Sequence, residues 1–345
     1  MYRSNYLLLL FLLLLLSSCD NKNNEKVSRG FYYWKSKFQL EERDQKLLKS
    51  LNANKIYVKF FDVDWNATIS EPMPYGTIQS KGELDSSFKV VPTIFITNRT
   101  FENLNNYEVS SFSYNVHHKI TELLNCFESP IKLSEVQIDC DWSMKTQSKY
   151  FDFLDNLKTR FGHQGIKVSS TIRLHQVKYF EKTGVPPVDK GMLMFYNMGD
   201  VTKADKDNSI YNIRDASKYL AKFDKYPLSL DVALPVFSWA AVYRKGKLIQ
   251  LISDFEPSLV DNKNLSEVKP NVFQASKSIE MKTFLVKAGD IIKFDIMTPE
   301  KTIEAASLVK PHLNDSVSVV LFDYNNLNLK RYNESDFEDI FDTFN

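Results

Sequence analysis

The sequence of 345 residues has few cysteines, few glycines and almost no net charge. Three cysteines are too few for the disulfide framework of a small secreted protein. With ten glycines, and with neither a P-loop nor a G-x-S-x-G motif, the chain lacks the loops that hold phosphates or present a nucleophilic serine. Its 44 basic and 43 acidic residues balance each other, which disfavours nucleic acid as a partner.

Metal-binding patterns are missing as well. The chain has no H-E-x-x-H motif and no Cys/His cluster with the spacing of a zinc site. We therefore expect no metal and no cofactor. Cys126 and Cys140 either form one disulfide or remain thiols, and we favour buried thiols because Cys140 lies in an expected strand.

One long apolar run occurs at the N-terminus, where Leu7–Leu16 follows Arg3. The run is shorter than the roughly 20 residues that cross a bilayer as a helix, and it matches the core of a signal peptide. The following Leu16-Ser17-Ser18-Cys19 resembles the lipobox of bacterial lipoproteins. The alternative is an ordinary signal peptide with a cysteine there by chance.

The lipobox resemblance implies a signal peptide at 1–18, lipidation of Cys19 and a polar tether that completes the segment 19–30. It also implies a lipid bilayer as a partner through Cys19, and a location in the bacterial cell envelope, periplasmic or facing outward. We expect 31–345 to form one domain.

Apolar strands and helical segments alternate along this domain, and several strands are nearly continuous apolar runs, as in a parallel sheet. The expected strands are Ile56–Trp65, Val90–Asn98, Val136–Ser143, Lys167–His175, Met192–Met198, Leu228–Trp239, Asp290–Met297 and Val317–Tyr324. Eight such units predict a (β/α)₈ TIM-type barrel. An open doubly wound sheet is the alternative, and we expect the irregular stretch 252–281 to be either a β-hairpin insertion or a loop.

Polar residues gather where these strands end, which is the active face of such a barrel. Side chains two positions apart share one face of a strand, so we expect three pairs to point together: Asp62 with Asp64, Asp139 with Asp141, and Arg173 with His175. Tyr196, Asn197 and Trp239 follow later strands. The alternative is that some of these pairs are ion pairs or helix caps.

Asp139-Cys140-Asp141-Trp142-Ser143 resembles the D-x-D-W-E signature of family-18 chitinase-like glycosidases, and Met194-Phe195-Tyr196-Asn197 resembles their M-x-Y-D segment. The resemblance implies a (β/α)₈ barrel acting on N-acetylglucosamine polymers. In that family the final Glu is the general acid, and here its position is Ser143. The motif lies on the third expected strand, where the family has it on the fourth.

Three hypotheses follow for the carboxyl-terminal mouth of the barrel. It is a glycoside hydrolase with a non-standard acid, and the catalytic candidates are Asp141, Asp139 and Asp64. Alternatively it binds a glycan without cleaving it, or it belongs to a structural or interaction lipoprotein without a ligand. The expected substrate-binding residues are Asp62, Arg173, His175, Tyr196, Asn197 and Trp239.

Overall fold

The structure, a computed structural model, describes residues 27–253, 255 and 262–345. The predicted signal peptide, the lipidation site Cys19 and most of the expected tether lie outside the described residues. Residues 27–30, which were expected in the tether, lie instead in the first strand. Over the described ranges, no helix combines the length and apolar character needed to cross a bilayer.

Eight parallel strands form a closed barrel. They are β1 (Val27–Tyr33), β3 (Lys55–Asn66), β6 (Lys89–Ile96), β7 (Glu135–Asp139), β8 (Lys167–Arg173), β9 (Lys190–Met194), β10 (Leu230–Pro235) and β18 (Val317–Phe322). Strand β1 pairs with both β3 and β18, and these two pairings close the ring. The predicted (β/α)₈ TIM-type fold is therefore confirmed, and the open doubly wound sheet is excluded.

One barrel strand was missed, and one of the expected barrel strands was wrong. The segment 27–33 was missed because Ser28, Arg29 and Gly30 interrupt its apolar character. The segment 290–297 was counted as a barrel strand, but it lies in a separate antiparallel sheet. Its alternating Lys293 and Asp295 are typical of a strand in such a sheet rather than of a parallel strand buried on both faces. Because one strand was missed and one was wrongly included, the predicted number of eight barrel strands was still right. The order changed, however, and Asp139 ends the fourth barrel strand, not the third.

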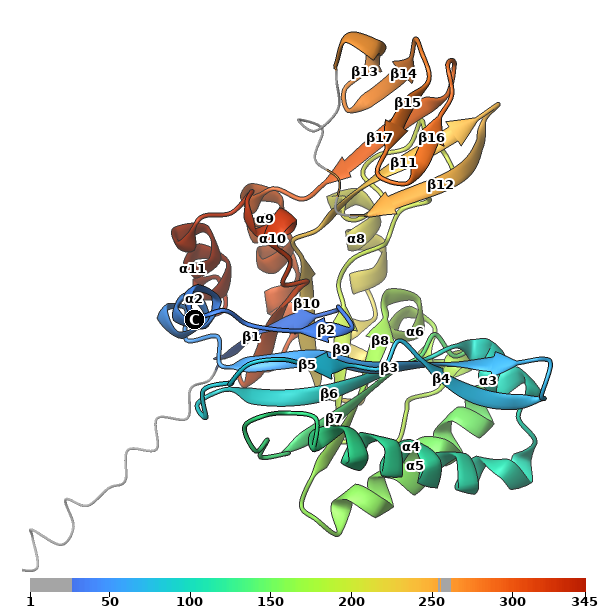
Figure 1. The fold of residues 1–345 in the computed structure, drawn as a ribbon, viewed down its shortest axis with the longest axis vertical. Coiled ribbons are helices and arrows are strands. Elements are labelled where there is room, and N and C mark those ends of the chain that lie inside the picture. Colours follow the sequence, from blue (N-terminus) through green and yellow to red (C-terminus); the bar gives the residue numbers. More distant parts are fainter. Residues whose placement is uncertain (1–26, 254, 256–261) are drawn as a thin grey trace, which may run out of the picture.

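Helices surround the barrel and follow most of its strands (Figure 1). They are α2 (Glu42–Ser50), α3 (Asn98–Asn103), α4 (Val109–Leu124), α5 (Gln147–Gly162), α6 (Leu174–Lys178), α7 (Phe180–Thr183), α8 (Ile213–Leu220), α9 (Pro299–Val309), α10 (Asn326–Leu329) and α11 (Glu334–Asp342). The long helices α4 and α5 contact each other and bury aromatic side chains such as Phe112 and Phe153. Cys140 is a buried free thiol, and Cys126 is free but exposed, which differs from the expectation that both are buried.

A second sheet of five strands lies in the connection between β10 and α9, and Figure 1 shows it projecting beyond the barrel. Its strands are β11 (Ser238–Arg244), β12 (Lys247–Ser253), β13 (Leu265–Lys269), β14 (Val272–Ala275) and β17 (Ile291–Ile296). It has its own apolar core, which includes Val242, Ile292 and Phe294. The second sheet therefore extends over more of the chain than the irregular stretch 252–281.

The remaining strands are short and lie outside the barrel ring. They are β2 (Lys37–Phe38), β4 (Glu71–Tyr75), β5 (Gln79–Ser80), β15 (Ile279–Met281) and β16 (Phe284–Val286). Strand β4 extends β3 as an antiparallel hairpin. Asp64, one of the predicted catalytic residues, lies in this hairpin.

Candidate functional site

Two adjoining cavities lie at the carboxyl ends of the barrel strands, of about 550 Å³ and 650 Å³. Asp141, Arg173, Tyr196 and Asn197 line both of them. Because one set of side chains forms the boundary of both spaces, the two cavities are parts of one mouth. Their sizes fall in the range of small-molecule sites in proteins.

Arg173 joins Asp139, the last residue of the fourth barrel strand, to Asp141 just beyond it. Its Nη2 lies 3.2 Å from Asp139 Oδ1, and its Nε donates to Asp141 Oδ1. Thr171 also donates to Asp139 Oδ1, at 2.6 Å. Asp139 is 5% exposed, whereas the side chain of Asp141 is 55% exposed. Arg173 therefore bridges one buried and one accessible carboxylate.

Burial and neighbouring charges have opposite effects on the pKa values of Asp139 and Arg173. Burial raises the pKa of Asp139 above its ordinary value of 3.8, although Arg173 and the hydroxyl of Thr171 act against the rise. Burial lowers the pKa of Arg173, but the charges of Asp139 and Asp141 outweigh it, so the pKa is raised overall. Burial also lowers the pKa of His175, which lines the second cavity.

Ser143 lies where the resembling family carries its catalytic glutamate. Its backbone N–H donates to Thr146 Oγ1 at 3.0 Å, and the Thr146 hydroxyl donates to Asn98 Oδ1 at 2.5 Å. Ser143 lines the second cavity. A neutral hydroxyl at this position cannot act as the general acid for a leaving glycosidic oxygen.

Aromatic rings form one wall of the first cavity. Phe237 lies between Tyr196 and Trp239, with ring centroids 5.5 Å and 5.4 Å away. Phe322 packs against Tyr196 at 5.4 Å and against Trp34 at 5.6 Å. All five rings line the cavity, so we call them the aromatic wall. Flat apolar faces beside charged and polar groups suit a ligand that has both apolar and polar surfaces.

The structure brings most of the predicted site residues together. Asp62, Asp139, Asp141, Arg173, Tyr196, Asn197 and Trp239 line the first cavity, and His175 lines the second. Asp64 lines neither of the two cavities. It accepts hydrogen bonds from Arg99 and from Thr97, and the bond from Arg99 is the largest cause of its lowered pKa.

Asp295 belongs to the segment 290–297, which was expected to be a barrel strand, but it lies on β17 of the second sheet. The prediction also omitted residues that line the first cavity, among them Trp34, Lys59 and Phe322. Lys59 forms an ion pair with Asp62 at 3.0 Å. Phe322 could have been predicted as a site residue, because it lies at the end of the eighth strand. Lys59 could not, because it lies in the middle of β3. Among the residues that the structure describes, no group of three His, Cys, Asp or Glu could hold a metal ion.

Comparison with known proteins gives structural matches only. No protein-family model and no curated protein matches the sequence. A class V chitinase from Nicotiana tobaccum has a TM-score of 0.53 and 10% identity, over 92% of this chain and 98% of its own. A mutant of that chitinase was also solved in complex with NAG4.

Two bacterial structures have the same fold. The spore cortex-lytic enzyme SleL of Bacillus cereus has a TM-score of 0.53 and 13% identity, over 92% of this chain and 75% of its own. The GH18 chitinase ChiB of Flavobacterium johnsoniae has a TM-score of 0.52 and 10% identity, over 92% of this chain and 94% of its own. Identities this low show the fold alone, and the fold is a GH18-like TIM barrel.

Proposed function

We propose that the barrel mouth binds a carbohydrate. The observation that carries the proposal is the combination in one cavity of the aromatic wall with the Asp139–Arg173–Asp141 cluster. Aromatic faces can stack on sugar rings, and the charged groups can bond hydroxyl or amide groups of the ligand. The similarity in fold to a chitinase solved with NAG4 supports this class of ligand.

Binding without cleavage is the form of this function that the site favours. Glycoside hydrolysis normally uses a proton donor beside the scissile oxygen and a second carboxylate. Ser143 stands at the position of the family's proton donor, and Arg173 donates hydrogen bonds to both aspartates. We therefore infer a glycan-binding protein on a glycosidase scaffold.

Hydrolysis is the second candidate, and one observation favours it. Burial raises the pKa of Asp139, and a raised pKa is a property of carboxyl groups that act as general acids. In this alternative Asp139 or the accessible Asp141 donates the proton. A structural or interaction role without any ligand is the remaining alternative. One experiment that measures both binding and cleavage distinguishes these three functions.

The test uses the full chain in a detergent without sugar groups, so that the detergent does not compete for the mouth. The tetramer of N-acetylglucosamine is titrated by calorimetry, and its products are followed by mass spectrometry. We expect binding and an intact tetramer. Trp239→Ala should weaken binding at least about tenfold, since it removes one ring of the wall. Cleavage by the wild type that is lost in Asp139→Asn or in Asp141→Asn would support hydrolysis, and absence of binding would contradict the proposal.

We also propose that a lipid on Cys19 anchors the chain to a bacterial membrane. The support is the lipobox resemblance in the sequence, and each buried CH₂ group of an acyl chain contributes about 0.8 kcal/mol to anchoring. Expressed in a bacterium, the chain should remain with the membrane fraction and carry acyl mass on Cys19. Cys19→Ser should release it, and a Cys19→Ser chain that still sediments with membranes would contradict the anchor.

A further inference from the structure

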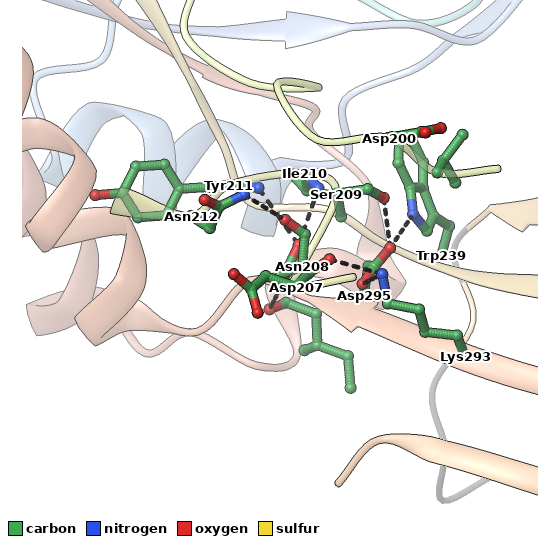
Figure 2. Close-up of polar contacts among 12 residues, drawn as sticks. Asp200, Asp207, Asn208, Ser209, Ile210, Tyr211, Asn212, Trp239, Lys293 and Asp295 are labelled. Atoms are coloured by element: carbon green, nitrogen blue, oxygen red, sulfur yellow. Dashed lines mark hydrogen bonds and ion pairs between the residues drawn. The ribbon is translucent and has the colours of Figure 1, made fainter. Parts of the chain in front are cut away.

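Asp295 is a buried carboxylate that connects two parts of the molecule, the second sheet and the segment between β9 and α8. It is 1% exposed and lies on β17 of the second sheet. Ser209, in the segment between β9 and α8, donates to its Oδ2 at 2.5 Å, and Trp239 Nε1 donates to the same oxygen at 3.1 Å. Figure 2 shows both hydrogen bonds converging on this carboxylate.

The other carboxylate oxygen faces a buried cation. Lys293 Nζ lies 3.1 Å from Asp295 Oδ1, and the side chain of Lys293 is 4% exposed. Lys293 also donates to the backbone oxygen of Asp207 at 2.7 Å, as Figure 2 shows. The charge on Asp295 is therefore compensated inside the protein, and its position is fixed from two sides.

Trp239 belongs both to this network and to the aromatic wall. It stands directly opposite Asp295 in the register of β11 and β17, and it lines the mouth cavity beside Phe237. Asp295 does not line the mouth, but it lines a separate cavity of about 550 Å³ on the side of the second sheet. The hydrogen bond from Trp239 to Asp295 thus lies within the second sheet, between β11 and β17, and it holds a ring of that sheet that lines the mouth together with Phe237.

We propose that Asp295 is a positioning residue that fixes the orientation of the Trp239 indole for glycan binding. The proposal rests on the proposed function, and it gives the second sheet a part in carbohydrate recognition. An indole that is free to turn about its side-chain bonds must be ordered when the ligand binds, and that ordering reduces affinity. A charge-assisted hydrogen bond to its only polar atom removes this cost in advance.

A double-mutant cycle tests whether Asp295 acts through Trp239. Calorimetry with the tetramer of N-acetylglucosamine compares the full wild-type chain with Asp295→Asn, Trp239→Phe and the double variant. Trp239→Phe keeps an aromatic ring but loses the indole N–H. We expect Asp295→Asn to weaken binding by about tenfold, and we expect no further loss when it is added to Trp239→Phe.

Asp290→Asn is the matched control. Asp290 accepts two hydrogen bonds from Arg244, at 2.8 Å and 2.7 Å, and lies directly before β17. Its replacement should lower the melting temperature of the second sheet without changing the affinity for the tetramer. Because this control also breaks a charged pair, it separates general destabilisation from loss of Trp239 orientation.

Two results would overturn the proposed role alone. One is an Asp295→Asn chain that binds the tetramer as the wild type does, and the other is a loss of affinity that simply adds to that of Trp239→Phe. A wild-type chain that binds no tetramer overturns the proposed function and this role with it. A loss in Asp290→Asn equal to that in Asp295→Asn would also contradict the role, since it would mean that stability controls affinity.

Discussion

At the scale of single residues, Arg173 organises the mouth of the barrel. It bridges Asp139 and Asp141, and it lines both adjoining cavities. The period of two along each strand predicted that Asp139 would share a face with Asp141. The same rule failed for Asp64, which lies where β3 pairs with β4 and accepts hydrogen bonds from Arg99 instead of lining the mouth. A partner that comes from another segment cannot be read from strand periodicity.

Replacing Arg173 should destabilise the protein. Arg173→Gln leaves Asp139 buried without its cation, and breaking a buried pair from one side costs about 3–5 kcal/mol of the free energy of unfolding. Denaturant unfolding measures the loss. Asp141→Asn is the control, because that carboxylate is accessible and its removal should cost about 1 kcal/mol or less. Equal losses in the two variants would contradict the bridging role.

The raised pKa of Asp139 predicts how stability depends on pH. A carboxyl group whose pKa is raised in the folded state stabilises the fold below its unfolded pKa, near 3.8. That contribution is lost as the pH rises through the folded pKa. Asp139→Asn should therefore gain stability relative to the wild type as the pH rises from about 4 towards neutral. Unfolding curves at several pH values measure this difference, and a variant that loses relative stability over this range would show that Arg173 outweighs burial.

At the scale of elements, β1 closes the barrel. It pairs with β3 and β18, and without it the sheet would remain open. Sequence periodicity missed this strand because Ser28, Arg29 and Gly30 interrupt its apolar pattern, and its place in the barrel depends on pairing with two other segments of the chain. The alternation of apolar and charged residues in 290–297 was visible in the sequence, but it indicates only that the segment is a strand. It does not report which sheet the strand joins.

Gly30 is a direct test of this closure. A Cβ atom at Gly30 would lie well inside contact distance of the backbone oxygen of Lys55 on β3. Gly30→Ala should therefore push β1 away from β3 and lower the free energy of unfolding by about 2 kcal/mol or more. Gly162→Ala is the control, since no atom outside its own helix would lie within 4 Å of the new Cβ. Thermal unfolding compares the two, and an unchanged Gly30→Ala would contradict a close pairing of β1 with β3.

At the scale of the whole molecule, the site is assembled from segments that are far apart in the chain. The barrel supplies the charged cluster, and the second sheet supplies Trp239 and Asp295. Alternation of strands and helices was enough to predict the barrel, because most of its units repeat one local pattern. The hydrogen bond from Trp239 to Asp295 depends on how the second sheet folds, so no local pattern could indicate it.

A structure of the full chain with the tetramer of N-acetylglucosamine tests the central claim most directly. The account predicts an intact oligosaccharide in the mouth, with a sugar ring against the aromatic wall and polar groups of the ligand bonded to Asp141 or Tyr196. A tetramer bound elsewhere, with the mouth filled only by solvent, would contradict the account. Cleaved products in the mouth would instead show that this barrel hydrolyses its ligand without a glutamate at position 143.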